Sequence, residues 1–183
     1  MIHENDLKLR EAQSEDCKLL WEWTNDIDVR RFSFNSKAIG WDDHCKWFQN
    51  KQNKPECIQY VGLNQDVTIG QIRFDILGSI AEIDYSIDPM FRGKGFGKLL
   101  LIKGIELFSS NIEKMVVLQG QVNEDNKASI RVFQKSGFRK IGQKTISHNK
   151  EVKAIYHTYQ LKIAPITRNI LCIDGKDYQK KAK

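Results

Sequence analysis

The sequence predicts an α+β fold: a mixed, mostly antiparallel sheet of about seven strands flanked by about four helices. Apolar and polar residues alternate over residues 82–87, as in a strand with one buried face. From Gly97 to Phe108 the apolar residues instead recur at helical spacing. The 183 residues, of which 40% are hydrophobic, suit one domain with a full core.

The same spacing rules predict the other elements along the chain. Strands are expected at residues 7–10, 60–63, 68–76, 82–87 and 115–122, with a closing hairpin at 142–147 and 152–161 that turns at 148–149. Helices are expected from Ser14 to a stop at Asn25-Asp26, and at residues 41–48, 97–108 and 126–136. The three strands between residues 60 and 87 should form an antiparallel meander, and residues 29–36 are expected to be irregular.

The turn between the 82–87 strand and the following helix has the composition of an anion site. Residues 92–97 read Arg-Gly-Lys-Gly-Phe-Gly, and glycine lets backbone N–H groups approach a ligand with no Cβ in the way. A helix N-terminus favours a phosphate, and Arg92, Lys94 and Lys98 add positive charge. A turn that needs glycine only for its geometry is the alternative. The sequence contains neither the P-loop pattern nor the six-residue glycine pattern of dinucleotide-binding folds.

Two motifs in this region resemble those of the GNAT N-acetyltransferases. The pattern R-x-x-G-x-G, here Arg92, Gly95 and Gly97, is similar to the loop that holds the acetyl-CoA pyrophosphate in that family. Residues 126–138 resemble the N-x-x-A-x-x-x-Y-x-x-x-G-F helix and strand start. The resemblance covers about residues 7–163. We therefore expect a GNAT domain at 1–163 and a C-terminal extension at 164–183, part of it disordered.

The resemblance implies acetyl-CoA as co-substrate and direct attack of a neutral amine on the thioester. The strands that hold Glu82 and Met115 would splay apart around the pantetheine arm. A strand N–H near residues 86–88 would then stabilise the developing oxyanion. The residues expected to bind the cofactor are Ile87, Arg92, Gly93, Lys94, Gly95, Phe96, Gly97, Lys98, Asn126 and Phe133.

An ammonium is not a nucleophile, so a base must accept the proton of the amine. We rank Glu82 first and Asp84, on the same strand face, second, and either also fits a solvent-facing strand carboxylate. The sequence departs from the family at Phe133, where many members place a tyrosine that protonates the leaving thiolate. Because a thiol with a pKa of about 8.5 leaves tolerably well as an anion, we expect no proton donor at that helix position here.

The N-terminal half resembles the GNAT subgroup that acetylates UDP-linked 4-amino-4,6-dideoxy sugars in pseudaminic-acid and related surface-glycan pathways. A UDP group needs cations and an aromatic platform, which Arg30 or Arg31 and a nearby aromatic residue would supply. The residues expected to bind the substrate are Asn25, Arg30, Phe34, Trp41 and His44.

Other interpretations remain open for this half. A related GNAT branch acetylates the N-termini of ribosomal proteins and shares the W-x-x-D/N beginning. A degenerate GNAT fold that only binds a partner is an alternative of another class. The tryptophans also fit a protein core, and His44 fits a partly buried helix histidine.

Composition narrows the classes of partner. The net charge of +6 is spread among 23 acidic residues, which suits an anionic small molecule rather than nucleic acid. No run approaches the ~18 apolar residues of a membrane span and no apolar leader is present, so we expect a cytoplasmic protein without a membrane partner. The cysteines at 17, 45, 57 and 172 lack zinc-site spacing, so no metal is implied and reduced thiols are expected. The oligomeric state is left open, a homodimer included.

Overall fold

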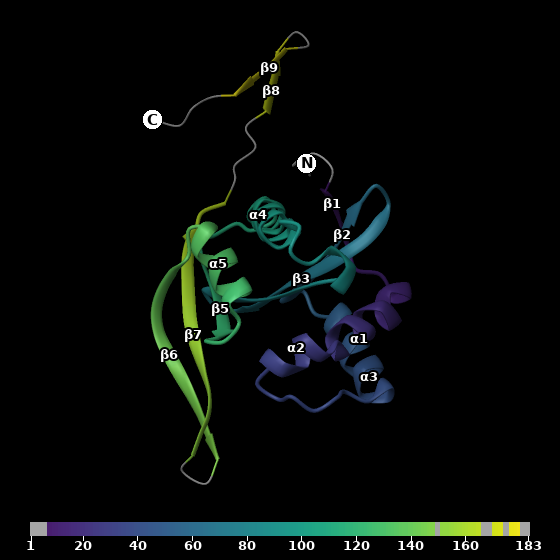
Figure 1. The fold of residues 1–183 in the computed structure, drawn as a ribbon. Helices are drawn as coiled ribbons and strands as arrows, with labels where there is room; N and C mark the ends of the chain where they lie inside the picture. The colour runs from purple at the N-terminus through teal and green to yellow at the C-terminus, as the bar shows by residue number, and fades with distance from the viewer. Residues whose placement is uncertain (1–6, 149–150, 166–169, 174–175, 180–183) are drawn as a thin grey trace.

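The computed structural model describes residues 7–148, 151–165, 170–173 and 176–179 (Figure 1). Seven strands form one sheet in the order β1-β2-β3-β4-β5-β7-β6. Their bounds are β1 Leu7–Glu11, β2 Cys57–Asn64, β3 Val67–Leu77, β4 Ile80–Ile87, β5 Val116–Asn123, β6 Arg139–His148 and β7 Glu151–Ile163. Neighbouring strands pair antiparallel except β4 and β5, which pair parallel. The predicted mixed, mostly antiparallel α+β sheet is confirmed.

The sheet opens between β4 and β5. Residues 80–82 pair with residues 117–119, and the pairing stops there. Because β4 runs on to Ile87 and β5 to Asn123, their C-terminal halves diverge and leave a gap in the middle of the sheet. This is the splay that the resemblance implies.

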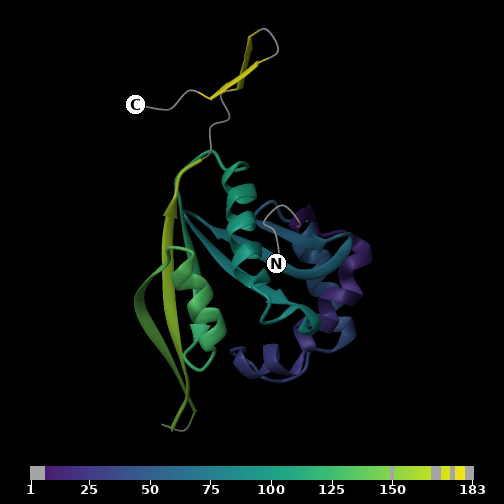
Figure 2. The same cartoon turned by 45° about the horizontal axis from the view of Figure 1, so that its top comes forward.

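Helices cover both faces of the sheet (Figures 1 and 2). One face carries α4 Phe96–Ser109 and α5 Lys127–Lys135, and the other carries α1 Cys17–Asn25, α2 Ile27–Phe32 and α3 Trp41–Gln52. Two neighbours on β3 show the difference. Ile72 packs on α4, so closely that a Cβ at Gly104 would lie 2.9 Å from it. Arg73 faces α3, where its guanidinium carbon lies 4.9 Å from the ring centroid of Trp47.

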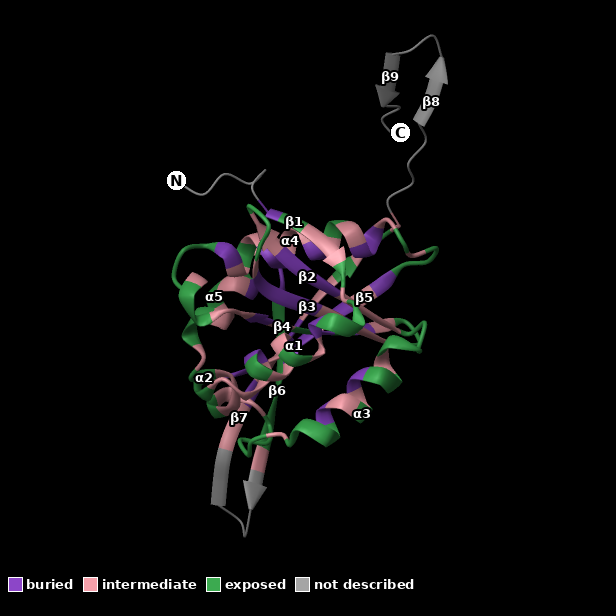
Figure 3. Cartoon of the chain, turned by 90° about the vertical axis from the view of Figure 1, so that its right-hand side faces the viewer, coloured by how far each residue is buried: buried purple, intermediate pink, exposed green. Residues whose placement is uncertain are grey.

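The larger core fills the space between the sheet and α4. Phe74 of β3 and Phe108 of α4 stack there with ring centroids 4.3 Å apart. A smaller cluster holds α1 and α3 on the other face and consists of Leu20, Trp23, Phe48 and Val61. In Figure 3 the buried residues concentrate along the central strands between these two layers.

One expectation about an element is wrong. Residues 29–36 were expected to be irregular, but residues 27–32 form α2. The Asp26 carboxylate caps this helix by accepting the N–H groups of Asp28 and Val29, each at 3.2 Å. A helix of six residues is too short to show apolar periodicity, so spacing could not reveal it.

The helix predicted from Ser14 begins as a 3-10 turn, Ser14–Asp16, before α1. The Asp16 carboxylate accepts a hydrogen bond from the backbone N–H of Gln13, the residue before this turn, at 2.7 Å. The same carboxylate also receives both terminal nitrogens of Arg10, so it fixes the end of β1 as well as the start of the helix.

Within the expected C-terminal extension, β8 Ile170–Ile173 and β9 Lys176–Gln179 pair antiparallel in a separate two-stranded sheet. Residues 166–169, 174–175 and 180–183 of that extension lie outside the described residues, as do residues 149–150 of the predicted hairpin turn. The boundary at residue 163 and the expected disorder stay predictions. Among the residues described, no helix is long and apolar enough to cross a membrane.

Candidate active site

The loop after β4 leads into a helix N-terminus with exposed backbone. Asp88 starts a 3-10 turn, Pro89–Phe91, by accepting the Met90 N–H at 2.8 Å. Gly93 and Gly95 then have φ angles of 73° and 90°, in the left-handed region that favours glycine. A Cβ built at either position would meet no atom within 4 Å. Gly95 is the N-cap of α4 and supplies no side-chain cap, so the first N–H groups of α4 are available to an anion.

A cavity of about 690 Å³ lies beside this loop, lined by β4, α4, α5 and α2. The residues expected to bind acetyl-CoA that line it are Ile87, Arg92, Gly93, Gly95, Gly97, Lys98 and Asn126. Lys94 belongs to the loop but is not one of the residues that line the cavity, and its Nζ lies 5.5 Å from the ring centroid of Phe91. Phe96 is buried and packs edge-on against the same ring. The glycine loop and the start of α5, which lie far apart in sequence, therefore meet at one cavity.

Phe133 lies in the core rather than on the cavity wall. Its ring packs over β5, where a Cβ on Gly120 would come within 2.3 Å of it. It stacks with Tyr159 of β7 at 5.7 Å and meets Phe138 edge-on at 4.8 Å. The structure thus gives this ring a packing role beneath the cavity.

Several cavity residues were not singled out from the sequence. Arg131 and Lys135 of α5 line the cavity together with Lys98 of α4 and Arg92 of the loop, so four cationic residues lie on its wall. Residues i and i+4 share one face of a helix. Arg131 and Lys135 are four residues apart in the predicted 126–136 helix, so the sequence places both cations on one helix face. This spacing was the available signal for them.

Tyr85 and Ser129 bridge the cavity from β4 to α5. Their hydroxyl oxygens lie 3.0 Å apart, and both residues line the cavity. Burial raises the pKa of Tyr85 to about 12, so its hydroxyl remains protonated at neutral pH. In the sequence Tyr85 belongs to the apolar face of the 82–87 strand, and that pattern gives no sign of a role for its hydroxyl.

The backbone at the end of β4 offers an N–H to the gap. Successive residues of a strand point their N–H groups to opposite sides. The Asp88 N–H donates to the Ile69 carbonyl of β3 at 2.9 Å, so the Ile87 N–H points the other way, towards β5. Since β5 has diverged at this point, the Ile87 N–H faces the gap.

Glu82 and Asp84 lie on the face of β4 opposite Tyr85, the face towards α1–α3, and both are exposed. Asp84 Oδ2 accepts from the Gln71 side chain at 3.0 Å and lies 3.5 Å from Nη1 of Arg73. Glu82 Oε1 accepts one long hydrogen bond, 3.4 Å, from Gln119 of β5. Asp84 is therefore engaged by neighbouring side chains, and Glu82 is the more open carboxylate.

Arg73 is the centre of the polar layer on this face. Its Nε donates to Asp75 at 2.8 Å, and Asp75 also pairs with Lys51 of α3. Burial opposes the charge on Arg73, but Asp84 and Asp75 outweigh that effect and raise its pKa. The layer is a network of paired charges that joins α3 to the central strands.

Arg30 of α2 also lies near Asp84. Burial lowers the pKa of Arg30, and the negative charge of Asp84 opposes that shift. Its terminal nitrogens donate to the Ser33 hydroxyl at 3.0 Å and to the Asn35 carbonyl at 3.2 Å. The buried Nε atom has no hydrogen-bond partner among the described residues. Arg30 therefore holds the following loop and leaves one buried donor without a partner among the described residues.

The other expected substrate residues fall into two groups. Asn25 clamps the backbone of Ile39, donating to its carbonyl at 3.0 Å and accepting its N–H at 2.7 Å. His44 is buried and its Nε2 contacts the Cys17 carbonyl at 3.1 Å. Both positions are structural supports for the loop and for α1.

The aromatic members of that set are exposed. Phe34 is 49% exposed and stacks on Tyr156 of β7, with ring centroids 4.0 Å apart. The Lys144 Nζ of β6 lies 5.4 Å from the centroid of the Phe34 ring. Trp41 is 43% exposed and meets Trp21 edge-on. The loop after α2 thus reaches across the gap to the β6–β7 hairpin.

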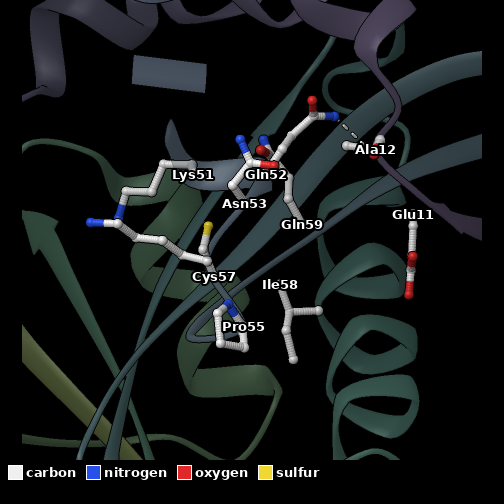
Figure 4. Close-up of a pocket in the computed structure, with 10 residues that line it drawn as sticks. Glu11, Ala12, Lys51, Gln52, Asn53, Pro55, Cys57, Ile58 and Gln59 are labelled. Carbon is white, nitrogen blue, oxygen red and sulfur yellow. Dashed lines mark hydrogen bonds between the residues drawn. The ribbon is translucent and has the colours of Figure 1, made fainter. Parts of the chain in front are cut away.

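A second cavity, of about 480 Å³, lies between β1, β2 and the end of α3 (Figure 4). Gln52 crosses it to donate to the Ala12 carbonyl at 3.3 Å. It does not include the glycine loop, Glu82 or Asp84.

A loop that can bind an anion at a helix N-terminus, next to a gap between two parallel strands, suits an enzyme that uses acyl-CoA. A family model described as "Acetyltransferase (GNAT) domain" matches residues 6–139. The chain belongs to this family, and it is an N-acetyltransferase with acetyl-CoA as co-substrate.

Solved structures share this fold. A spermidine N-acetyltransferase from Vibrio cholerae, in complex with CoA and spermine, is 17% identical with a TM-score of 0.75, covering 86% of this chain and 96% of that one. The Salmonella typhimurium protein yncA, with its cofactor acetyl-CoA, is 20% identical with a TM-score of 0.72, covering 92% and 100%. An N-acetyltransferase from Staphylococcus aureus Mu50 is 22% identical with a TM-score of 0.70, covering 85% and 97%. No curated protein matches the sequence.

Proposed function

We propose that the protein acetylates the exocyclic amine of a UDP-linked 4-amino-4,6-dideoxyhexose. The observation that carries this proposal is the placement of Arg30, whose buried Nε has no hydrogen-bond partner among the described residues, near the carboxylate of Asp84. A guanidinium suits a diphosphate, and the exposed Phe34 ring suits a uracil. Both lie on the side of the gap opposite the glycine loop, so the nucleotide and acetyl-CoA would approach from different faces.

The residues of β4 support direct transfer. Acetyl-CoA supplies an acetyl group activated as a thioester. The Ile87 N–H would donate to the carbonyl oxygen as negative charge develops on it. Glu82 would accept the proton of the amine, directly or through water, because its carboxylate is less engaged than that of Asp84. The new C–N bond forms as the C–S bond breaks, and the sulfur leaves with the electron pair as the CoA thiolate.

The cavity residues fit acetyl-CoA. Lys98, Arg131 and Lys135 supply positive charge on its walls, and Gly93 and Gly95 leave space where a side chain would stand. Asn126 lines the cavity beside the start of α5, where its side chain already accepts the Ser129 N–H at 3.0 Å. The amide group of Asn126 would therefore meet the pantetheine through its remaining donors.

The nucleotide requirement tests the proposal. Since the reacting amine is remote from the diphosphate, contacts to UDP would act by positioning the amine. Removing UDP from the substrate should lower kcat/KM by at least ~tenfold although the amine is unchanged. Arg30→Ala should cause a similar loss for the full sugar nucleotide and little further loss for the sugar alone.

Arg31 provides the matched comparison. It lies on the same helix, but it is exposed and its guanidinium sits 5.4 Å from the ring centroid of Phe32. Arg31→Ala should leave kcat/KM for the sugar nucleotide within about twofold. A larger loss from Arg31→Ala than from Arg30→Ala would move the nucleotide contact to Arg31.

A further inference from the structure

Arg92, the first residue of the glycine-loop motif, uses its side chain away from the loop. Its Nη2 donates to Asp26 at 2.6 Å, its Nη1 donates to Asp28 at 3.0 Å, and its Nε donates to the Ile87 carbonyl at 3.0 Å. All three guanidinium nitrogens therefore have partners, two of which belong to α2 and its cap. The side chain ties the end of β4 and the glycine loop to the N-terminus of α2.

Arg92 donates to the same Asp26 oxygen that caps the N-terminus of α2. The same Oδ1 that receives Arg92 also accepts the N–H groups of Asp28 and Val29. The Asp26 side chain is only 16% exposed, so solvent screens this ion pair less than a surface pair. The direction of α2 and the position of the glycine loop are consequently fixed by one shared carboxylate.

Other contacts reinforce this junction. Trp23 of α1 donates its indole N–H to Asp88 at 2.9 Å, and Asp88 begins the turn that precedes the glycine loop. Asp28, Val29 and Phe32 of α2 themselves line the acetyl-CoA cavity. α2 therefore contributes to the cofactor cavity while also presenting Arg30 on its acceptor side.

The charges argue that Arg92 has little capacity left for phosphate. Two carboxylates face one guanidinium, which makes the cluster negative overall. A diphosphate placed against it would have to displace Asp26 or Asp28. The cations that remain on the cavity wall are Lys98, Arg131 and Lys135.

We propose that Arg92 is a positioning residue that couples the acetyl-CoA loop to the acceptor helix α2, so that binding of acetyl-CoA orders α2 and prepares the acceptor site. The acceptor role of α2 rests on the proposed function, whereas the coupling between loop and helix does not. Because such coupling is reciprocal, an acceptor bound to α2 would strengthen acetyl-CoA binding by the same factor.

Two variants separate coupling from phosphate binding. Arg92→Ala removes the guanidinium. Asp26→Ser keeps a side-chain oxygen able to cap α2 and removes only the charge that pairs with Arg92. Lys46→Ala, an exposed cation on α3, is the control for loss of one positive charge. Calorimetry measures the Kd for acetyl-CoA, and amide hydrogen exchange follows residues 27–32 with and without acetyl-CoA.

In the wild type and in Lys46→Ala, acetyl-CoA should slow exchange in α2 by ~tenfold or more. In both Arg92→Ala and Asp26→Ser this slowing should fall below about threefold, while the Kd for acetyl-CoA rises by less than about threefold. Undiminished slowing in the two variants overturns the coupling. A tenfold weaker Kd in Arg92→Ala but not in Asp26→Ser also overturns it and makes Arg92 a phosphate ligand.

The exchange readout needs no acceptor, so it stands even if the sugar nucleotide proves inert. With the amine that the wild type does acetylate, both variants should raise the acceptor KM at least ~fivefold. Because the coupling is reciprocal, the KM for acetyl-CoA at saturating acceptor should rise by a similar factor, although its Kd without acceptor changes by less than about threefold. The double variant should be no worse than either single variant, because both remove one interaction. Additive losses would contradict a shared contact.

Discussion

The two sides of the gap between β4 and β5 are built from different kinds of interaction. The cofactor side consists of a glycine loop, two helix N-termini and an apolar wall, nearly all from residues 85–135. The acceptor side consists of paired charges and stacked rings contributed by distant segments. Arg73 lies there against Asp84, Asp75 and Trp47.

The difference matches two tasks: backbone groups can bind a phosphate on one side, and side-chain networks shape the surface on the other. Backbone N–H groups at a helix N-terminus recognise a phosphate whatever the neighbouring side chains are. Side-chain networks instead depend on each partner being present, because a buried charge left unpaired is costly. Substitutions should therefore act locally on the cofactor side and spread through the network on the acceptor side.

The largest effect should come from Glu82, the proposed base. If Glu82 accepts the amine proton, Glu82→Gln should lower kcat/KM at neutral pH by ~10² or more and remove the acidic limb of the pH profile. The Kd for acetyl-CoA should not change. Asp84→Asn is the matched variant on the same strand face, and a larger loss from it would transfer the role to Asp84.

On the cofactor side, Gly95→Glu should weaken acetyl-CoA binding by more than tenfold, over ~1.4 kcal/mol. It places a carboxylate at the anion site and a Cβ where φ is 90°. Gly95→Ala has the same backbone strain without the charge, so calorimetry of both variants separates the two causes. An unchanged Kd for Gly95→Glu would show that this loop does not hold the phosphates.

A smaller effect is expected from Phe133→Tyr. The Phe133 ring packs against Gly120, Phe138 and Tyr159, so a hydroxyl added to it would enter a filled core. We expect turnover to change by less than tenfold and thermal stability to fall. A tenfold or greater rise in turnover, measured at saturating substrates, would mean that a proton donor at this position does assist the leaving thiolate.

The smallest expected effect concerns His44 in the helical layer of the acceptor side. Burial lowers the pKa of His44, although its contact with the Cys17 carbonyl opposes the shift. The unfolded chain therefore binds a proton on His44 more readily than the folded protein does. The folded protein keeps its full stability above the pKa that His44 has in the unfolded chain, and it loses stability as the pH falls below that pKa.

Thermal unfolding at pH 7.5 and pH 5 should show this contribution. The Tm of wild type should fall more than that of His44→Gln. Equal falls would mean that His44 does not titrate differently in the two states.

The parts that the sequence predicts well are those built from neighbouring residues. The strand at 82–87, the glycine loop and the following helix are local, and the structure contains all three. The anion site at the loop stays a prediction. The order of strands then follows from the resemblance to GNAT enzymes. The gap between β4 and β5 is present as expected.

The parts that it predicts poorly depend on contacts between distant segments. Nothing in the sequence around Arg92 indicates that its partners are Asp26 and Asp28. The stacking of Phe34 on Tyr156 joins a loop to a strand near the other end of the domain. Asn25 and His44 were expected to bind the substrate because their segments resemble the sugar-nucleotide subgroup. Their side chains contact backbone groups in the structure, and a role in substrate binding stays a prediction.

A mass-spectrometric acceptor assay tests the central proposal most directly. Purified protein and acetyl-CoA would be incubated separately with UDP-4-amino-4,6-dideoxyhexoses, with peptides bearing free N-termini of ribosomal proteins, and with spermidine, the substrate named for a protein of the same fold. We expect efficient acetylation of a sugar nucleotide and little of the other amines. Efficient acetylation of peptides or spermidine with inert sugar nucleotides would contradict it, and binding of acetyl-CoA without transfer to any amine would contradict catalysis itself.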